Sequence, residues 1–196
     1  MATAVAVSDP PARSLYRISV AQYDQMARVG VLTKADRVEL IDGLLLEKMT
    51  KNERHLAATC LIHRKFDRQL PEGWFAVMEF PVALSRSEPE PDVMVMRGDI
   101  PDYFKRKPTA ADVLLVVEVS DSSYADDRAM RHYYAESGIS TYWIANIPAR
   151  RIEVYTDPKD DDYQTRRDHG WDDHVEFTIE GWTLRLAVSD LMSPPE

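Results

Sequence analysis

Two stretches of the chain each place a carboxylate at the end of an apolar run: EPEPDVMVM, residues 88–96, and DVLLVVEVSDSS, residues 112–123. Asp92 follows a proline and precedes four apolar residues, and Glu118 lies between two valines. Such runs are typical of buried strands that are apolar on both faces. Carboxylates are rarely fully buried without a partner, so both positions are candidates for a functional site.

The pairing of these two strands decides the fold and places the two carboxylates. If residues 92–97 and 112–119 pair antiparallel, the start of the first strand lies beside the end of the second. Asp92 and Glu118 then meet at one edge of the sheet, where they repel each other unless a cation lies between them. Because only oxygen ligands are present, a hard cation such as Mg²⁺ or Mn²⁺ is favoured over zinc.

The remaining sequence predicts an α/β fold with a mixed sheet. The predicted helices are 19–30, 52–70, 123–137 and a short one at 188–192, with Leu56, Cys60, Phe66 and Leu70 on the buried face of the second. The predicted strands are a hairpin at 37–49 around Asp42-Gly43, and 74–85, 140–146, 151–157, 175–179 and 182–186. Helix 123–137 crosses over to strand 140–146, parallel to strand 112–119. The polar segment 158–174 is expected to be an exposed loop with a short strand around Tyr163.

Length and composition indicate an ordinary globular protein. The 196 residues fit a single domain, which we expect at 15–196 behind a flexible tail at 1–14. Cys60 is the only cysteine, which fits a reducing compartment, and we find neither a signal peptide nor a bilayer-spanning run, so we expect a cytoplasmic protein without membrane contact. The net charge of −9 argues against broad nucleic-acid binding, although a bound cation and a local basic stripe can offset it.

Several motifs in order resemble one known family. They are VELIDGLLLEKM, a helix carrying His55, EFPVAL, EPDVMVM, LLVVEVSDSS, DDRAM and YYAESGISTYWI, spread over residues 15–156. Together they are similar to the Uma-type putative restriction endonuclease family, part of the PD-(D/E)xK nuclease-like superfamily. Each motif alone is weak, but their order and spacing are specific for the family.

The resemblance implies a restriction-endonuclease-like fold and a Mg²⁺- or Mn²⁺-dependent hydrolase of DNA phosphodiester bonds. It implies that Asp92, Glu118, the main-chain carbonyl of Val119 and the upstream acid Glu39 hold the metal. A cation there polarises the phosphate and activates water. A nearby lysine neutralises the charge that develops on the phosphate.

The chain departs from the family at this lysine. Ser120 stands two residues after Glu118, where the superfamily motif has lysine, and no lysine occurs between Lys107 and Lys159. The family's displaced lysine corresponds to Arg131 when counted forward from Glu118, and to Met130 when counted back from Trp143. Arg131 can stabilise a phosphate but cannot act as a general base.

Other interpretations stay open from the sequence. A non-catalytic module with the same fold, acting as a DNA- or protein-binding scaffold, is favoured by the missing lysine, and hydrolysis of another phosphate ester is a third hypothesis. A homodimer is a further hypothesis. His55 is expected to pack or cap its helix rather than act in catalysis, and Asp127 to favour the dipole of its helix.

Overall fold

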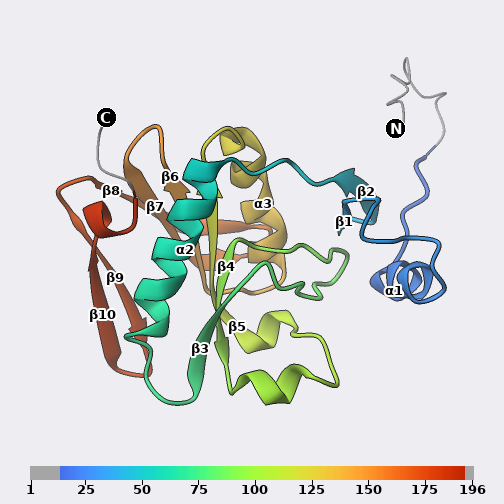
Figure 1. Ribbon diagram of the computed structural model, residues 1–196, viewed down its shortest axis with the longest axis horizontal. Helices are drawn as coiled ribbons and strands as arrows, with labels where there is room; N and C mark the ends of the chain where they lie inside the picture. Colours follow the sequence, from blue (N-terminus) through green and yellow to red (C-terminus); the bar gives the residue numbers. More distant parts are fainter. Residues whose placement is uncertain (1–13, 193–196) are drawn as a thin grey trace.

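The computed structural model describes residues 14–192, and its centre is a six-stranded sheet (Figure 1). Residues 1–13, in the predicted tail, and residues 193–196 lie outside the described part. The strands stand in the order β3 (Trp74–Met78), β4 (Val93–Arg97), β5 (Val113–Ser120), β6 (Thr141–Asn146), β7 (Arg151–Lys159) and β8 (Asp162–Gly170). All neighbours are antiparallel except β5 and β6, which are parallel. The predicted α/β fold with a mixed sheet flanked by helices is confirmed.

Two helices cover the two faces of this sheet. Helix α2 (Glu53–Asp67) packs on one face together with the separate hairpin of β9 (His174–Ile179) and β10 (Trp182–Ala187). Helix α3 (Tyr124–Glu136) packs on the other face. The last described element is a short 3-10 helix at Val188–Asp190, where a short terminal helix was predicted. Within residues 14–192, no helix is both long and apolar enough to cross a membrane.

The N-terminal elements lie to one side of the sheet (Figure 1). They are helix α1 (Val20–Arg28) and the hairpin of β1 (Val38–Ile41) and β2 (Leu44–Glu47). The predicted hairpin is confirmed, and its turn residues Asp42 and Gly43 have φ angles of 48° and 73°. Left-handed conformations at both positions match the Asp-Gly turn that the sequence indicates. Strand β1 reaches the body through a bridge between Leu40 and Glu88.

The register of β4 against β5 is the feature that positions the site. Val93 pairs with Val117, so the residue before Val93 lies opposite the residue after Val117. Those residues are Asp92 and Glu118. The predicted antiparallel pairing is therefore confirmed, and so is the parallel β5–α3–β6 crossover.

The buried face predicted for the second helix is partly wrong. Phe66 is fully buried, but Leu56 is 47% exposed and Cys60 is exposed. The buried residues of α2 are His55, Ala58, Thr59, Ile62 and Phe66, a set spaced three and four residues apart. The helix thus turns small and polar side chains to the sheet, which a search for large apolar residues misses.

The prediction of an exposed loop over 158–174 is also wrong, although its short strand around Tyr163 is confirmed as the start of β8. Strand β7 continues to Lys159 and pairs in one register with β8, which runs from Asp162 to Gly170. Strand β8 lies at the edge of the sheet, where polar side chains remain in water, so its composition resembles that of a loop. The predicted 74–85 strand is shorter than expected, because β3 ends at Met78 and Glu79 has a φ angle of 50°.

The corrected face of α2 can be tested by stability. Phe66→Ala removes a fully buried ring that lies 5.7 Å from Trp143, between ring centroids. We expect a loss of about 3 to 5 kcal/mol in the free energy of unfolding. Leu56→Ala, ten residues earlier on the same helix, is expected to lose less than about 1 kcal/mol. Urea denaturation measures both, and equal losses would contradict the assigned face.

Candidate active site

A cleft of about 860 Å³ opens where β4 begins and β5 ends. Its walls come from the β1–β2 hairpin, the start of α2 and the first turns of α3. Its lining is strongly acidic, with the carboxylates Glu39, Glu47, Glu79, Glu90, Asp92, Glu118, Asp121, Asp126 and Asp127. Arg37, Lys48 and Lys51 are the basic residues that line it. This excess of negative charge is suited to cations rather than to bare phosphates.

Asp92 and Glu118 are held together by reciprocal backbone hydrogen bonds. The Asp92 N–H donates to Glu118 Oε2 at 3.2 Å, and the Val119 N–H donates to Asp92 Oδ2 at 2.8 Å. Each carboxylate is thus fixed by the backbone of the opposite strand. The structure brings Asp92, Glu118 and Val119 together, as the strand pairing predicts.

Glu118 carries an unfavourable negative charge. Burial raises its pKa well above the ordinary value, and the charges of Asp92 and Asp127 raise it further. The Tyr134 hydroxyl donates to Glu118 Oε1 at 2.7 Å and partly offsets these effects. A positive charge beside Glu118 would therefore stabilise its ionised form.

Asp92 has the partners that Glu118 lacks. Lys51 Nζ lies 2.6 Å from Asp92 Oδ1, and His55 Nε2 lies 3.0 Å from Asp92 Oδ2. Burial alone would raise the pKa of Asp92, but His55 and Lys51 hold it below the ordinary value. Lys51 also contacts Glu79 at 2.8 Å, and these two carboxylates raise the pKa of Lys51 against the effect of burial. Lys51 is thus charged and fixed at the carboxylate pair.

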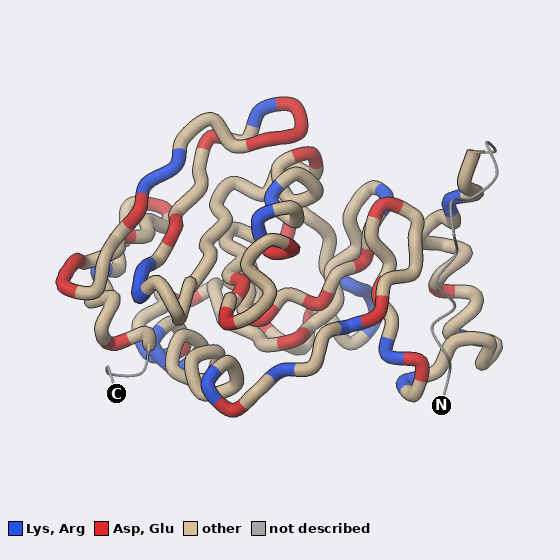
Figure 2. The backbone as a smooth tube through the Cα atoms, turned by 90° about the horizontal axis from the view of Figure 1, so that it is seen from above, with Lys and Arg blue, Asp and Glu red and all other residues tan. Residues whose placement is uncertain are grey.

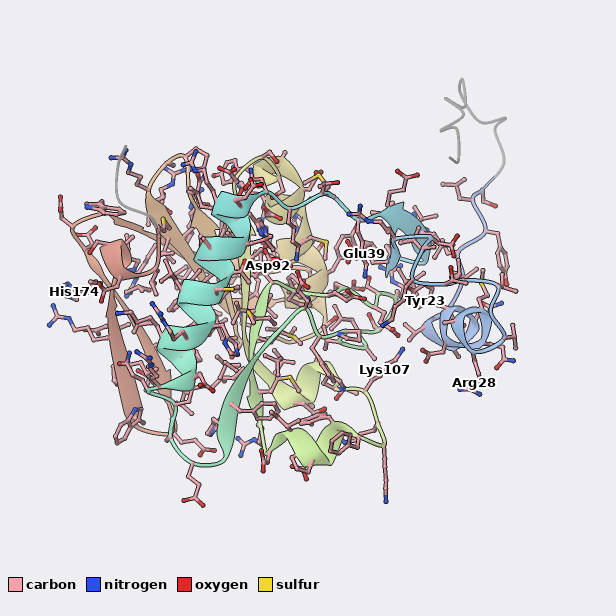
Figure 3. The ribbon with its side chains drawn as sticks, viewed as in Figure 1. Tyr23, Arg28, Glu39, Asp92, Lys107 and His174 are labelled. Carbon is pink, nitrogen blue, oxygen red and sulfur yellow. The ribbon has the colours of Figure 1, made fainter. Side chains whose placement is uncertain are left out.

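Glu39 reaches the same cleft from the N-terminal side, on β1 (Figure 3). The Glu90 N–H donates to Glu39 Oε2 at 3.4 Å. Burial raises the pKa of Glu39, against the effects of this hydrogen bond and of Lys48. Glu39 is therefore a second acid in the cleft whose charge a cation would stabilise.

Arg131 is not brought to the cleft. Its Nε lies 2.9 Å from Asp162 Oδ1 on β8, and its Nη1 donates to the Arg128 carbonyl at 2.9 Å. The preceding residue, Met130, does line the cleft. The α3 position that faces the carboxylates is therefore apolar, and the cation nearest to Asp92 comes from the start of α2 instead.

Sequence reasoning missed Lys51, His55 and Asp127. Lys51 and His55 stand four residues apart at the start of a helix capped by Asn52, whose side chain accepts from the His55 N–H at 3.0 Å. Lys51 precedes this cap and lies outside the helix, so helical spacing does not relate the two side chains, and no local pattern in the sequence indicates that both reach Asp92. Asp127 lines the cleft, and burial raises its pKa to about 6, so a dipole role alone does not describe it.

The oxygen atoms at this site fit a hard cation, although they do not form a ready-made metal centre. Within residues 14–192, no three His, Cys, Asp or Glu side chains converge closely enough to hold an ion. Oδ1 of Asp92 is instead taken by the ammonium group of Lys51. The crowded charges of Asp92, Glu118 and Asp127 are nevertheless the arrangement that a divalent cation relieves.

The raised pKa of Asp127 predicts a pH-dependent gain on mutation. Because its folded pKa of about 6 exceeds the ordinary 3.8, its contribution to stability falls as pH rises through this interval and then stays constant. Asp127→Asn should therefore stabilise the fold at pH 8 by up to roughly 3 kcal/mol more than at pH 4. Asp126→Asn, an exposed carboxylate in the same helical turn, is the control. Melting curves at both pH values measure the difference, and similar behaviour of the two variants would contradict the assignment.

Comparisons with known proteins agree with this fold. The chain matches the family model Uma2, described as "Putative restriction endonuclease", over residues 20–189. The crystal structure of a putative nuclease belonging to DUF820 from Anabaena variabilis is similar, with a TM-score of 0.69 and 16% sequence identity, covering 89% of this chain and 97% of the other. At this identity the likeness shows the fold alone. A search among curated proteins finds no match.

Proposed function

Because the chain belongs to the Uma2 family of putative restriction endonucleases, we propose that it is a Mg²⁺- or Mn²⁺-dependent endonuclease that hydrolyses phosphodiester bonds in DNA. The observation that carries the proposal is the Asp92–Glu118 pair, joined by reciprocal backbone hydrogen bonds in an acidic cleft. The proposal also includes a cytoplasmic location and, as a hypothesis, a homodimer.

The proposed metal ligands are Asp92, Glu118, the main-chain carbonyl of Val119 and Glu39. A divalent cation at this position polarises a phosphate oxygen and lowers the pKa of water. The raised pKa values of Glu118 and Glu39 support this set, since both acids lie in the cleft without a cationic partner that restores their ordinary values. His55 Nε2 contacts Asp92 Oδ2 and orients that carboxylate.

We propose that Lys51 neutralises charge on the phosphate, the role that the resemblance assigns to a lysine on the helix after Glu118. An ammonium group has three N–H donors, and Asp92 and Glu79 accept two of them. The third is free to donate to a phosphate oxygen in the cleft, where it stabilises the developing negative charge. Arg131 is engaged by Asp162 and is not required for this step in the proposal.

Metal binding is predicted to appear as a change in stability. Mn²⁺ should raise the melting temperature of the wild type, because the cation binds the folded state only. Glu118→Gln can keep the hydrogen bond from Tyr134 while removing a disfavoured charge, so without metal it should melt at the same temperature or higher. We expect the variant to lose the gain given by Mn²⁺.

The control for this measurement is Glu47→Gln, a carboxylate on exposed β2 at the rim of the cleft. It should keep the stabilisation by Mn²⁺. Asp92→Asn should lose it, as Glu118→Gln does. Equal stabilisation of all four proteins by Mn²⁺ would contradict the proposed ligands.

The role of Lys51 can be tested by nicking of a supercoiled plasmid in Mn²⁺. Lys51→Met should lower the rate about 100-fold or more, the effect typical of losing a group that stabilises transition-state charge. Arg131→Ala should keep most of the activity. Lys48→Met removes a second cleft lysine, one that contacts Glu90 at 2.5 Å, and serves as the matched control.

The same assay decides between the enzyme and the scaffold. If the wild type cuts no faster than Asp92→Asn, the non-catalytic scaffold replaces the nuclease as the function. If the wild type is active and Arg131→Ala is the variant that loses activity, the assignment of Lys51 is wrong while the nuclease stands.

A further inference from the structure

A second buried carboxylate lies away from the cleft, on β7. Glu153 has no exposed surface, and its two oxygens accept from four side chains. Tyr124 Oη lies 2.7 Å and Arg151 Nη2 lies 2.9 Å from Oε1, and Tyr155 Oη lies 2.7 Å and Arg166 Nη2 lies 3.1 Å from Oε2. Unlike Glu118, this carboxylate is surrounded by donors, two of which carry positive charge.

Such a network is a costly way to stabilise a fold. Taking a carboxylate and its guanidinium partners out of water has a desolvation penalty that their attraction often fails to exceed, and apolar residues of similar size frequently do as well. The network has a geometric effect. Glu153 fixes Arg151 and Arg166, each about one third exposed, at defined positions on the surface.

Two of the arginines around Glu153, Arg166 and Arg128, keep donors that no carboxylate takes. By contrast, the three guanidinium nitrogens of Arg151 all lie near Glu153 or Asp168. Arg166 uses Nε and Nη2 on Asp168 and Glu153, which leaves Nη1. Arg128 lies 5.8 Å above the ring of Tyr124, and its buried Nε has no hydrogen-bond partner within the described residues. A planar guanidinium with free N–H groups is suited to phosphate oxygens.

Of this arginine cluster (Arg128, Arg151 and Arg166), Arg151 lies at the sheet edge that holds the cleft, while Arg166 reaches Glu153 from farther along β8 and Arg128 projects from α3. Ser120 at the end of β5 pairs with Asn146 on β6, Asn146 pairs with Arg151 on β7, and Arg151 pairs with Gly170 on β8. Neighbouring strands are about 4.8 Å apart, so Arg151, two strands away from β5, lies roughly 10 Å along this edge from the carboxylate pair. Helix α3 separates the two, with Asp127 facing the cleft and Arg128 facing the cluster.

The local charge of the cluster contrasts with its surroundings. Three arginines face the two carboxylates Glu153 and Asp168, in a chain whose net charge is −9. Figure 2 shows that basic and acidic residues are otherwise interspersed along the backbone rather than separated into a basic face. A polyanion that enters the acidic cleft therefore needs positive contacts beside it, and the cluster offers them at a fixed distance.

We propose that Arg128, Arg151 and Arg166 form a binding site for the backbone phosphates of DNA that flanks the cleft. This inference rests on DNA as the substrate in the proposed function. One strand advances about 3.4 Å per nucleotide along the helix axis, so Arg151 would meet a phosphate roughly three base steps from the cleaved bond. The contacts are independent of sequence and position the duplex over the carboxylate pair.

The salt dependence of DNA binding tests the site. The parent protein is Glu118→Gln in Mg²⁺, which prevents cleavage, and the probe is a fluorescent 20-base-pair duplex measured by anisotropy at several salt concentrations. Each phosphate contact adds about 0.9 to the slope of log affinity against log salt concentration. Arg128→Gln and Arg166→Gln should each lower the slope by about 0.9, and the double variant by about 1.8.

Two further variants serve as controls. Arg185→Gln removes an arginine on β10 that also pairs with a carboxylate, Glu176 at 3.8 Å, and should leave the slope unchanged. Arg166→Lys keeps the charge and should keep the slope. Arg128 has no ion pair within the described residues, so Arg128→Gln carries the test even if loss of Arg166 disturbs the fold, which melting curves show.

The outcomes separate this inference from the proposed function. Unchanged slopes in the arginine variants, or a parent that binds the duplex without salt dependence, would overturn the phosphate site even if the wild type nicks plasmid. Lowered slopes together with a wild type that does not nick would retain the phosphate site on a DNA-binding scaffold.

Discussion

The antiparallel pairing of β4 with β5 forces two carboxylates into contact at a buried strand end. With Val93 opposite Val117, the backbone N–H of Asp92 meets Glu118 and the N–H of Val119 meets Asp92. A shift of the register by one residue would exchange the valines of β4, which pack on the α2 face, with its methionines, which pack on the α3 face, and would separate the acids. The apolar core of the sheet therefore fixes the register that holds Asp92 beside Glu118, so a change of this register would disrupt both the core and the site.

The surrounding elements supply what this pair requires electrostatically. Helix α2 brings Lys51 and His55 to Asp92, and α3 brings Tyr134 to Glu118. The pKa values of the two acids shift in opposite directions, since that of Asp92 is lowered and that of Glu118 is raised. Such a division is common where neighbouring titratable groups have different tasks. The division follows from the partners of each acid, because Lys51 and His55 reach Asp92 while Glu118 meets Tyr134 and the charges of Asp92 and Asp127.

The parts of this structure that the sequence predicted are those set by local pattern. The Asp-Gly hairpin, the apolar strands around Asp92 and Glu118, and the helix ending at Gly138 each have a signal within a few residues. Strand β8 was missed because an edge strand needs few apolar residues, and the face of α2 because Ala58 and Thr59 pack as well as larger side chains where the sheet comes close. Lys51 was missed because its contact with Asp92 joins residues 41 positions apart, which no local pattern reveals.

Two carboxylates in one sheet, Glu153 and Glu118, illustrate how a structural group differs from a functional one. Glu153 is surrounded by two tyrosine hydroxyls and two guanidinium groups, so each of its oxygens accepts from two donors. Glu118 has one hydroxyl, one backbone N–H and two negative neighbours, and it borders a cleft. Because the same sheet provides Glu153 with four donors, two of them cationic, the lack of a cationic partner at Glu118 is not imposed by the fold. The shortage of positive charge at Glu118 is thus a property of the site itself, and it is the shortage that a bound cation would fill.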